Sequence, residues 1–143
     1  MAVTISVYNH TTARFADGTN DVTNTYKVKL LTVATFDATH ASLAATGGTE
    51  AATGTGYTAG GQSLSGVAVT TVTTNDAKFD ANDLAWSASG GPITANYGIL
   101  YNDSHVDDLP VAFIDFDGSQ SAGAGTQFII VWNASGIFTW TVT

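Results

Sequence analysis

The sequence contains no cysteine. Neither a disulfide framework nor a thiolate metal site can therefore form, and the chain must be stabilised by its buried core. A chain of 143 residues is long enough for this, because a domain of about 150 residues buries roughly 68–70% of the surface that its unfolded form exposes. We predict one domain spanning residues 1–143, and the absence of cysteine fits folding in a reducing cytoplasm.

Positive charge is also scarce. Lys and Arg together number 4 against 12 Asp and Glu, which gives a formal net charge of −8. Binding to nucleic-acid phosphates or to anionic membranes depends on clustered Lys and Arg, so we expect neither partner. Glu50 is the only glutamate, and this shortage of Glu, Lys and Arg also argues against helices, whose surfaces they usually fill.

The sequence shows no sign of a targeting or membrane-spanning segment. The first residues, MAVTISVYNHTTARF, alternate between apolar and polar side chains and lack the pattern of a signal peptide. No window approaches the 18 or so apolar residues of a membrane helix. We expect a soluble protein that is made in the cytoplasm without processing.

Short alternating apolar runs, separated by turn residues, dominate what is present. They predict strands near 3–7, 26–33, 67–74, 78–81, 83–88, 93–101, 111–116, 127–132 and 137–142. Spacing of this kind is typical of an all-β protein, and we predict an antiparallel β-sandwich that resembles a jelly roll. The last two strands are predicted to form a hairpin around Asn133–Gly136. Trp86, Trp132 and Trp140 are predicted in the core.

Four local predictions follow from shorter patterns. Residues 37–46 are the one credible helix, with Asp37 as its N-cap and Gly47 at its end. Asp17-Gly18 is typical of a hairpin turn. Lys27 and Lys29 alternate with apolar residues, which indicates a solvated face or a protected edge strand. The glycine-rich stretch 47–66 is predicted to be an ordered loop anchored by Tyr57 and Leu64.

No catalytic motif is present, and we predict that the chain is not an enzyme. The three histidines lie far apart, and no serine lies in a nucleophile-elbow motif. Paired carboxylates, as in Asp115 and Asp117, are more simply explained as turn formers. We expect no cofactor, no metal and no small-molecule ligand, although the acidic loop 102–108 leaves calcium open as an alternative.

Four stretches occur in an order that resembles small structural proteins of tailed-bacteriophage virions. They are GYTAGGQSL (56–64), YGILYND (97–103), FIDFDG (113–118) and VWNASGIFTWTV (131–142). The resemblance covers roughly residues 26 to 142. One departure is Phe116-Asp117-Gly118, where the related chains are expected to have Phe-Gly-Gly; this changes a turn and leaves the fold in place.

The resemblance implies a capsid decoration, or cement, protein that binds the outside of an assembled shell. Its partners would be the major capsid protein and further copies of itself, as a dimer or trimer, and its location the capsid exterior. The candidate contact segments are Ala2–Val7, Gly54–Gln62 and Asp103–Leu109. The contact residues proposed within them are Ala2, Thr4, Ser6, Tyr57, Gly60, Gly61, Gln62, Asp103, His105 and Asp107.

Three alternatives stay open. A neck, tail or fibre-associated virion protein would share the fold and differ in its place in the particle. A carbohydrate-binding module would present aromatic side chains flat on one face. A glycoside hydrolase, which needs two facing carboxylates, is the least favoured.

Overall fold

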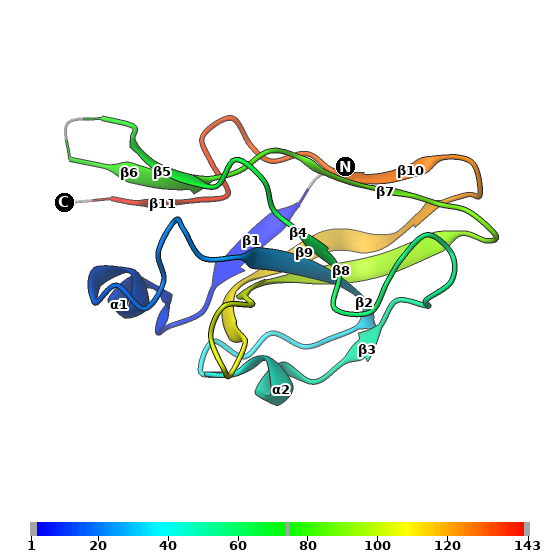
Figure 1. Ribbon diagram of the computed structural model, residues 1–143, viewed down its shortest axis with the longest axis horizontal. Helices are drawn as coiled ribbons and strands as arrows, with labels where there is room; N and C mark the ends of the chain where they lie inside the picture. The colour runs from blue at the N-terminus through cyan, green and yellow to red at the C-terminus, as the bar shows by residue number, and fades with distance from the viewer. Residues whose placement is uncertain (1–2, 74, 142–143) are drawn as a thin grey trace.

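The computed structural model describes residues 3–73 and 75–141 and is built almost entirely from antiparallel strands (Figure 1). The strands are β1 (Thr4–Val7), β2 (Tyr26–Val33), β3 (Thr49–Glu50), β4 (Gln62–Ser63), β5 (Ala68–Thr71), β6 (Ala77–Asp80), β7 (Leu84–Ser87), β8 (Ile93–Asn102), β9 (Leu109–Ala122), β10 (Gln127–Ile130) and β11 (Phe138–Trp140). The two helices are α1 (Thr11–Ala16) and α2 (Leu43–Thr46). Neither is long and apolar enough to cross a membrane. The prediction of an all-β antiparallel fold is confirmed.

The largest sheet has six strands in the order β1-β9-β8-β2-β3, and β4 also pairs with β2. Its centre is the long antiparallel pair β8–β9, in which Ile99 lies opposite Phe113. The predicted alternation places Tyr26, Val28 and Leu30 of β2 in the core. Because β2 lies inside the sheet, between β8 and β3, Lys27 and Lys29 do not protect an edge, as one interpretation of the sequence held.

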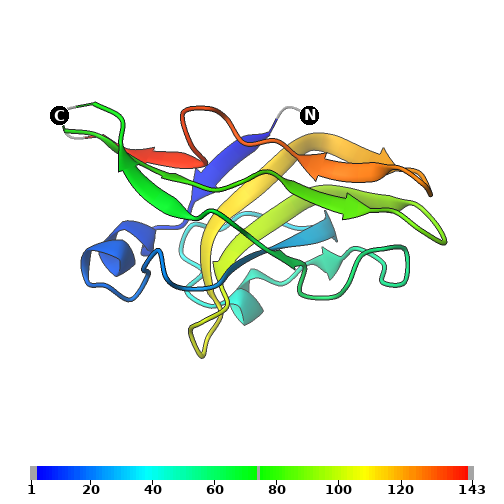
Figure 2. The ribbon, with the colours of Figure 1, turned by 45° about the horizontal axis from the view of Figure 1, so that its top comes forward.

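Two smaller sheets cover one face of the large sheet (Figure 2). One consists of β7 and β10, and the other has the order β11-β6-β5. The chain runs from β6 directly into β7 and returns from β10 to β11, so the two sheets follow one another along the same pair of chain segments. The architecture is therefore two antiparallel layers, as in a β-sandwich.

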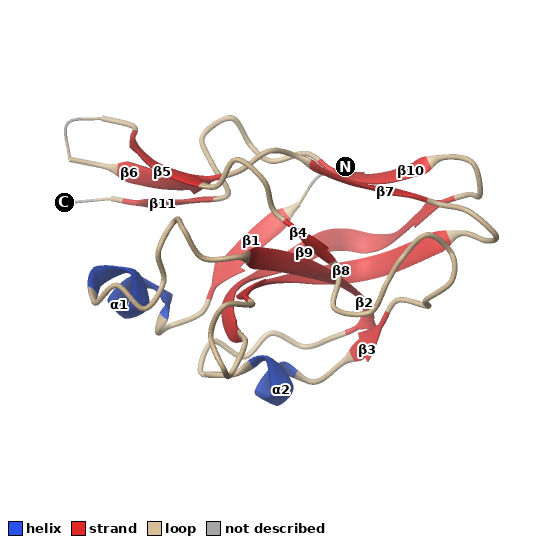
Figure 3. Ribbon diagram, viewed as in Figure 1, coloured by secondary structure: helices blue, strands red, loops and turns tan. Residues whose placement is uncertain are grey.

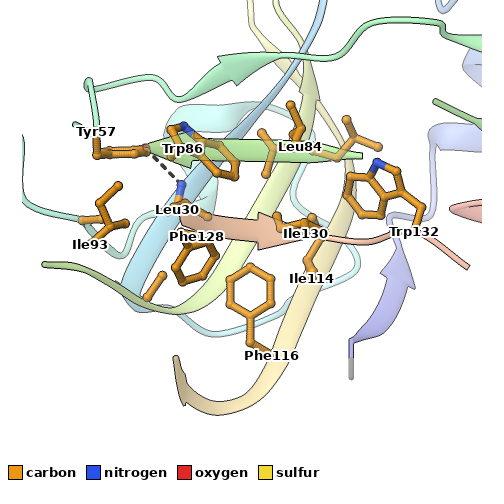
Figure 4. Close-up of a cluster of buried hydrophobic side chains, with 14 of the residues drawn as sticks. Leu30, Tyr57, Leu84, Trp86, Ile93, Ile114, Phe116, Phe128, Ile130 and Trp132 are labelled. Atoms are coloured by element: carbon orange, nitrogen blue, oxygen red, sulfur yellow. Dashed lines mark hydrogen bonds between the residues drawn. The ribbon is translucent and has the colours of Figure 1, made fainter. Parts of the chain in front are cut away.

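The main core lies between these layers (Figure 4). From the small sheets it receives Phe79, Leu84, Trp86, Phe128 and Ile130, and from the large sheet Leu30, Ile114 and Phe116, among others. Trp86 and Trp132 are buried, as predicted, whereas Trp140 is half-buried and packs against the edge of the core.

A second, smaller core covers the opposite face of the large sheet. It contains Tyr8, Leu31, Ile99, Tyr101 and Phe113. The segment that leads from β2 to α2 packs against it through Ala34, Phe36 and Leu43. Figure 3 shows that the two short helices lie at the margins of the sheets and form no layer of their own.

The prediction of a helix over 37–46 is wrong in extent. Only residues Leu43–Thr46 are helical, and the N-cap is Ser42, whose side chain accepts a hydrogen bond from the Ala45 amide. Asp37 instead accepts bonds from the amide and hydroxyl of Thr39 in a separate turn. A short aspartate side chain can bond to backbone amides two residues on, and here this turn forms in place of a helix start. Gly47 follows the helix with a positive φ of 58°, as expected.

Both hairpin predictions are wrong. Asp17 and Gly18 follow helix α1, which the sequence analysis missed because threonine and phenylalanine are weak helix formers. Strands β10 and β11 do not pair with each other: β10 pairs with β7, and β11 with β6. Long-range pairing thus overrode the local hairpin signal at Asn133–Gly136, although Gly136 does adopt the predicted positive φ, of 100°.

Candidate functional site

The glycine-rich loop before β4 is held to the body of the molecule by one buried tyrosine. The hydroxyl of Tyr57 accepts the Leu30 amide at 3.0 Å and donates to a carboxylate oxygen of Glu50 at 2.6 Å. The same Glu50 oxygen accepts the Gly60 amide at 2.6 Å. Because Tyr57 is only 2% exposed, the loop is ordered, and the prediction that Tyr57 anchors it is confirmed.

The burial of Tyr57 has a second consequence. Its side chain serves the interior and is not available to touch a partner, so it is removed from the candidate contact residues. Leu64, the other predicted anchor, donates its amide to the Tyr26 carbonyl at 2.8 Å and packs against the main core.

Two of the three predicted contact segments lie on either side of β2. The hydroxyl of Tyr101 donates to the Gly60 carbonyl at 2.7 Å, which fixes the glycine loop beside β8. Lys27, whose register partners are Ser63 on one side and Tyr101 on the other, forms an ion pair with Asp103 at 2.8 Å. We call residues 58–62 and 103–108 together the two-loop surface.

Glycine is required where the first of these loops meets β2. A side chain at Gly61, which has a φ of 82°, would collide with the carbonyl oxygen of Val28. Gly60, with a φ of 86°, has more room, since its nearest neighbour would be the Tyr101 hydroxyl at 3.5 Å. The paired glycines therefore allow the loop backbone to lie directly against the sheet.

Charges beneath the two-loop surface are partly buried. Burial lowers the pKa of the Lys29 ammonium, and the carboxylates of Glu50 and Asp108 act in the opposite direction. Burial, followed by the negative charge of Asp103, raises the pKa of the Tyr101 hydroxyl. Burial and the hydrogen bond to Glu50 likewise raise the pKa of Tyr57. Both tyrosines thus remain neutral hydrogen-bond donors.

The exposed part of the two-loop surface combines polar side chains with one apolar residue at a loop tip. Gln62 and Asp107 are exposed, whereas Gly60, Gly61, Asp103 and His105 are half-buried. The His105 Nδ1 accepts the Asp107 amide at 3.1 Å, and Val106 at the tip of the second loop is 92% exposed. Within the described residues, no three acidic or histidine side chains lie close enough to hold a metal ion.

The third predicted contact segment lies elsewhere. Strand β1 is at the far edge of the six-stranded sheet, where Thr4 lies opposite Asp115. Thr4 is exposed and Ser6 half-buried, while Ala2 lies outside the described residues. The structure therefore brings together the segments at 58–62 and 103–108 and separates both from the N-terminal segment.

An apolar groove lies between α1 and the three-stranded sheet. It encloses about 410 Å³ and is lined by Phe15, Val22, Val69 and Trp140, with Asn20 among its polar groups. The Phe15 and Trp140 rings are tilted by 71° at a centroid distance of 5.1 Å. These two rings do not form the flat platform that a carbohydrate-binding module would present.

The sequence analysis missed the residue that organises the two-loop surface. Glu50 joins Tyr57 to Gly60, and its one available signal was that the only glutamate of the chain lies within the glycine-rich stretch 47–66. Comparison with protein-family models, with curated proteins and with solved structures finds no match.

Proposed function

We propose that the chain is a non-enzymatic structural protein of a tailed-phage particle that binds the outside of the assembled capsid and stabilises it. The two-loop surface is the observation that carries this proposal. Tyr57, Glu50 and Tyr101 fix the loop at 58–62 to the sheet, and the Lys27–Asp103 ion pair holds the loop at 103–108. Little conformational entropy is therefore lost when the loops dock on a rigid lattice.

The charge of the chain supports the same role. A protein that coats the exterior of a shell has no need of a basic surface for DNA, and a net charge of −8 keeps free copies soluble before assembly. A subunit that binds the assembled shell, and not its separated parts, stabilises the shell by mass action. Many weak contacts with one lattice also reinforce one another through avidity.

The test is binding to shells assembled from the phage's own coat protein in the absence of this chain. We expect the purified protein to co-sediment at a copy number close to that of the coat subunits and to raise the melting temperature of the shell. Binding at only a few copies per particle would move the assignment to the neck or tail. No binding at any concentration tested would overturn the proposal.

A pair of variants locates the contact. Gln62→Lys places a positive charge on the two-loop surface, and Ser119→Lys places the same charge at an exposed position of β9. We expect Gln62→Lys to weaken shell binding about tenfold or more, as expected for an interface hot spot, and Ser119→Lys to leave it unchanged. Equal effects of the two variants would assign the contact to another surface.

A further inference from the structure

Strand β10 (Gln127–Ile130) has an open edge. Among the described residues its sheet partner is β7 alone. The Ala88 amide donates to the Thr126 carbonyl at 2.8 Å, and the Trp132 amide donates to Asp83 at 2.9 Å. Backbone groups alternate in direction along an antiparallel strand, so even-numbered residues of this stretch bond toward β7. The amides and carbonyls of Gln127, Ile129 and Val131 therefore point toward the open edge.

The side chains along this edge are apolar and exposed. Phe128 and Ile130 face the core, whereas Ile129 is 39% and Val131 54% exposed on the outer face. Proteins usually protect open edges with lysine, proline or inward-pointing charge. None of these occurs in β10 or in β7, so this edge is chemically ready to accept another strand.

The charge distribution indicates that the added strand comes from a second copy of the chain. From Gly118 to Thr143, and from Leu84 to Asn102, the sequence contains no Asp, Glu, Lys, Arg or His. The other exposed sheet edges lie closer to charge: β5 and β11 both pair with β6, which carries the Lys78–Asp80 ion pair, and β1 lies opposite Asp115. In a chain with a net charge of −8, two copies meet with the least repulsion through the uncharged β7–β10 sheet.

We propose that two copies of the chain associate through β10, in antiparallel register around a two-fold axis at Ile129. The two β7–β10 sheets then form one continuous four-stranded sheet. This register places Ile129 opposite Ile129 of the partner subunit, and Gln127 opposite Val131 of the partner subunit. The contact is isologous, since the same patch serves both copies. It does not depend on the proposed role at a capsid.

Sedimentation equilibrium of the purified chain tests the proposal without shells. We expect a species of twice the 14.7 kDa chain mass. Ile129→Lys places two like charges directly opposite one another across the two-fold axis, which destabilises strand pairing. We expect this variant to raise the dimer dissociation constant by about tenfold or more.

The matched control is Val33→Lys, which makes a similar apolar-to-lysine change at a residue that is 61% exposed at the end of β2. It should leave the dissociation constant unchanged. Circular dichroism melting of both variants establishes that each is folded. A monomeric wild-type chain, a trimer, or equal sensitivity to the two variants would overturn the proposal; none of these outcomes bears on whether the chain binds shells.

Discussion

Tyr57 shows how much one hydroxyl group can fix. It satisfies the buried amide of Leu30 (Figure 4). It also holds Glu50, which in turn holds the Gly60 amide. Replacement by phenylalanine keeps the ring and leaves a buried N–H without a partner. We expect Tyr57→Phe to lower the free energy of unfolding by about 1 to 3 kcal/mol, measured by urea denaturation.

Tyr97→Phe is the control for this change. Tyr97 is half-buried, and its ring contacts Phe113 at a centroid distance of 5.4 Å, but its hydroxyl makes no hydrogen bond within the described residues. We expect a loss below about 0.5 kcal/mol, the usual range for changes away from such features. Equal losses for the two variants would show that the Tyr57 hydroxyl does not anchor the loop.

His10 links stability to pH. Its Nε2 lies 3.0 Å from the Pro110 carbonyl. Burial, and to a smaller degree the positive charge of Arg14, lowers the pKa of His10 below its ordinary value of 6.5, although the bond to Pro110 opposes this. The folded state thus favours the neutral imidazole. Its contribution is complete above the ordinary pKa and is lost as the pH falls through 6.5 toward the lowered value.

His10→Gln removes this titration and keeps a side-chain N–H that can donate to Pro110. We expect wild type to lose more stability than His10→Gln when the pH falls from about 7.5 to about 5.5, measured as the difference between their urea midpoints at each pH. Identical pH profiles would show that a lowered pKa of His10 does not contribute to the pH dependence of stability.

At the scale of elements, the contact between the glycine loop and β2 depends on Gly61. Gly61→Ala would force either the loop or β2 to move, because the new methyl group collides with the Val28 carbonyl. Gly60→Ala meets only the cost of a positive φ, about 1 to 2 kcal/mol. We expect Gly61→Ala to cost at least about 2 kcal/mol more than this, again by urea denaturation. Losses of similar size would show that the loop shifts freely.

The sequence predicted the positions of the strands better than it predicted which strands pair. Apolar runs located β2, β8 and β9 because these strands supply buried residues to the cores on both faces of the large sheet. They could not show that β10 pairs with β7, since register between distant segments is decided by which apolar faces complete the core. Helix α1 was also hard to predict because a contact that holds it is distant in sequence. The hydroxyl of Thr11 donates to the carbonyl of Val111.

The candidate site was predicted in the same partial way. The sequence singled out the stretches around Gly60 and Asp103 as loops. It gave no sign that Tyr101 holds the first loop and Lys27 the second, because those contacts need β2 and β8 to be neighbours. It named Tyr57 both as an anchor of the loop and as a contact residue, and only the first of these roles fits a side chain that is 2% exposed.

At the scale of the whole molecule, the charge opposes association. Two copies with a net charge of −8 each repel one another, and the Debye length falls from about 30 Å at 0.01 M salt to about 8 Å at 0.15 M. We therefore expect the dissociation constant of the β10 dimer to fall several-fold between about 0.01 M and about 0.15 M NaCl, measured by sedimentation. An increase with salt would indicate a contact that depends on attraction between opposite charges.

The pairing of β1 with β9 also bears on how the chain folds during its synthesis. Thr4 is the register partner of Asp115, and Phe138 near the other end pairs with Phe79. At roughly 5 to 20 residues per second, the ribosome adds the partner of β1 about 5 to 20 seconds after β1 itself. The first strand therefore waits unpaired beside the ribosome, where chaperones that bind exposed apolar segments have the most time to act.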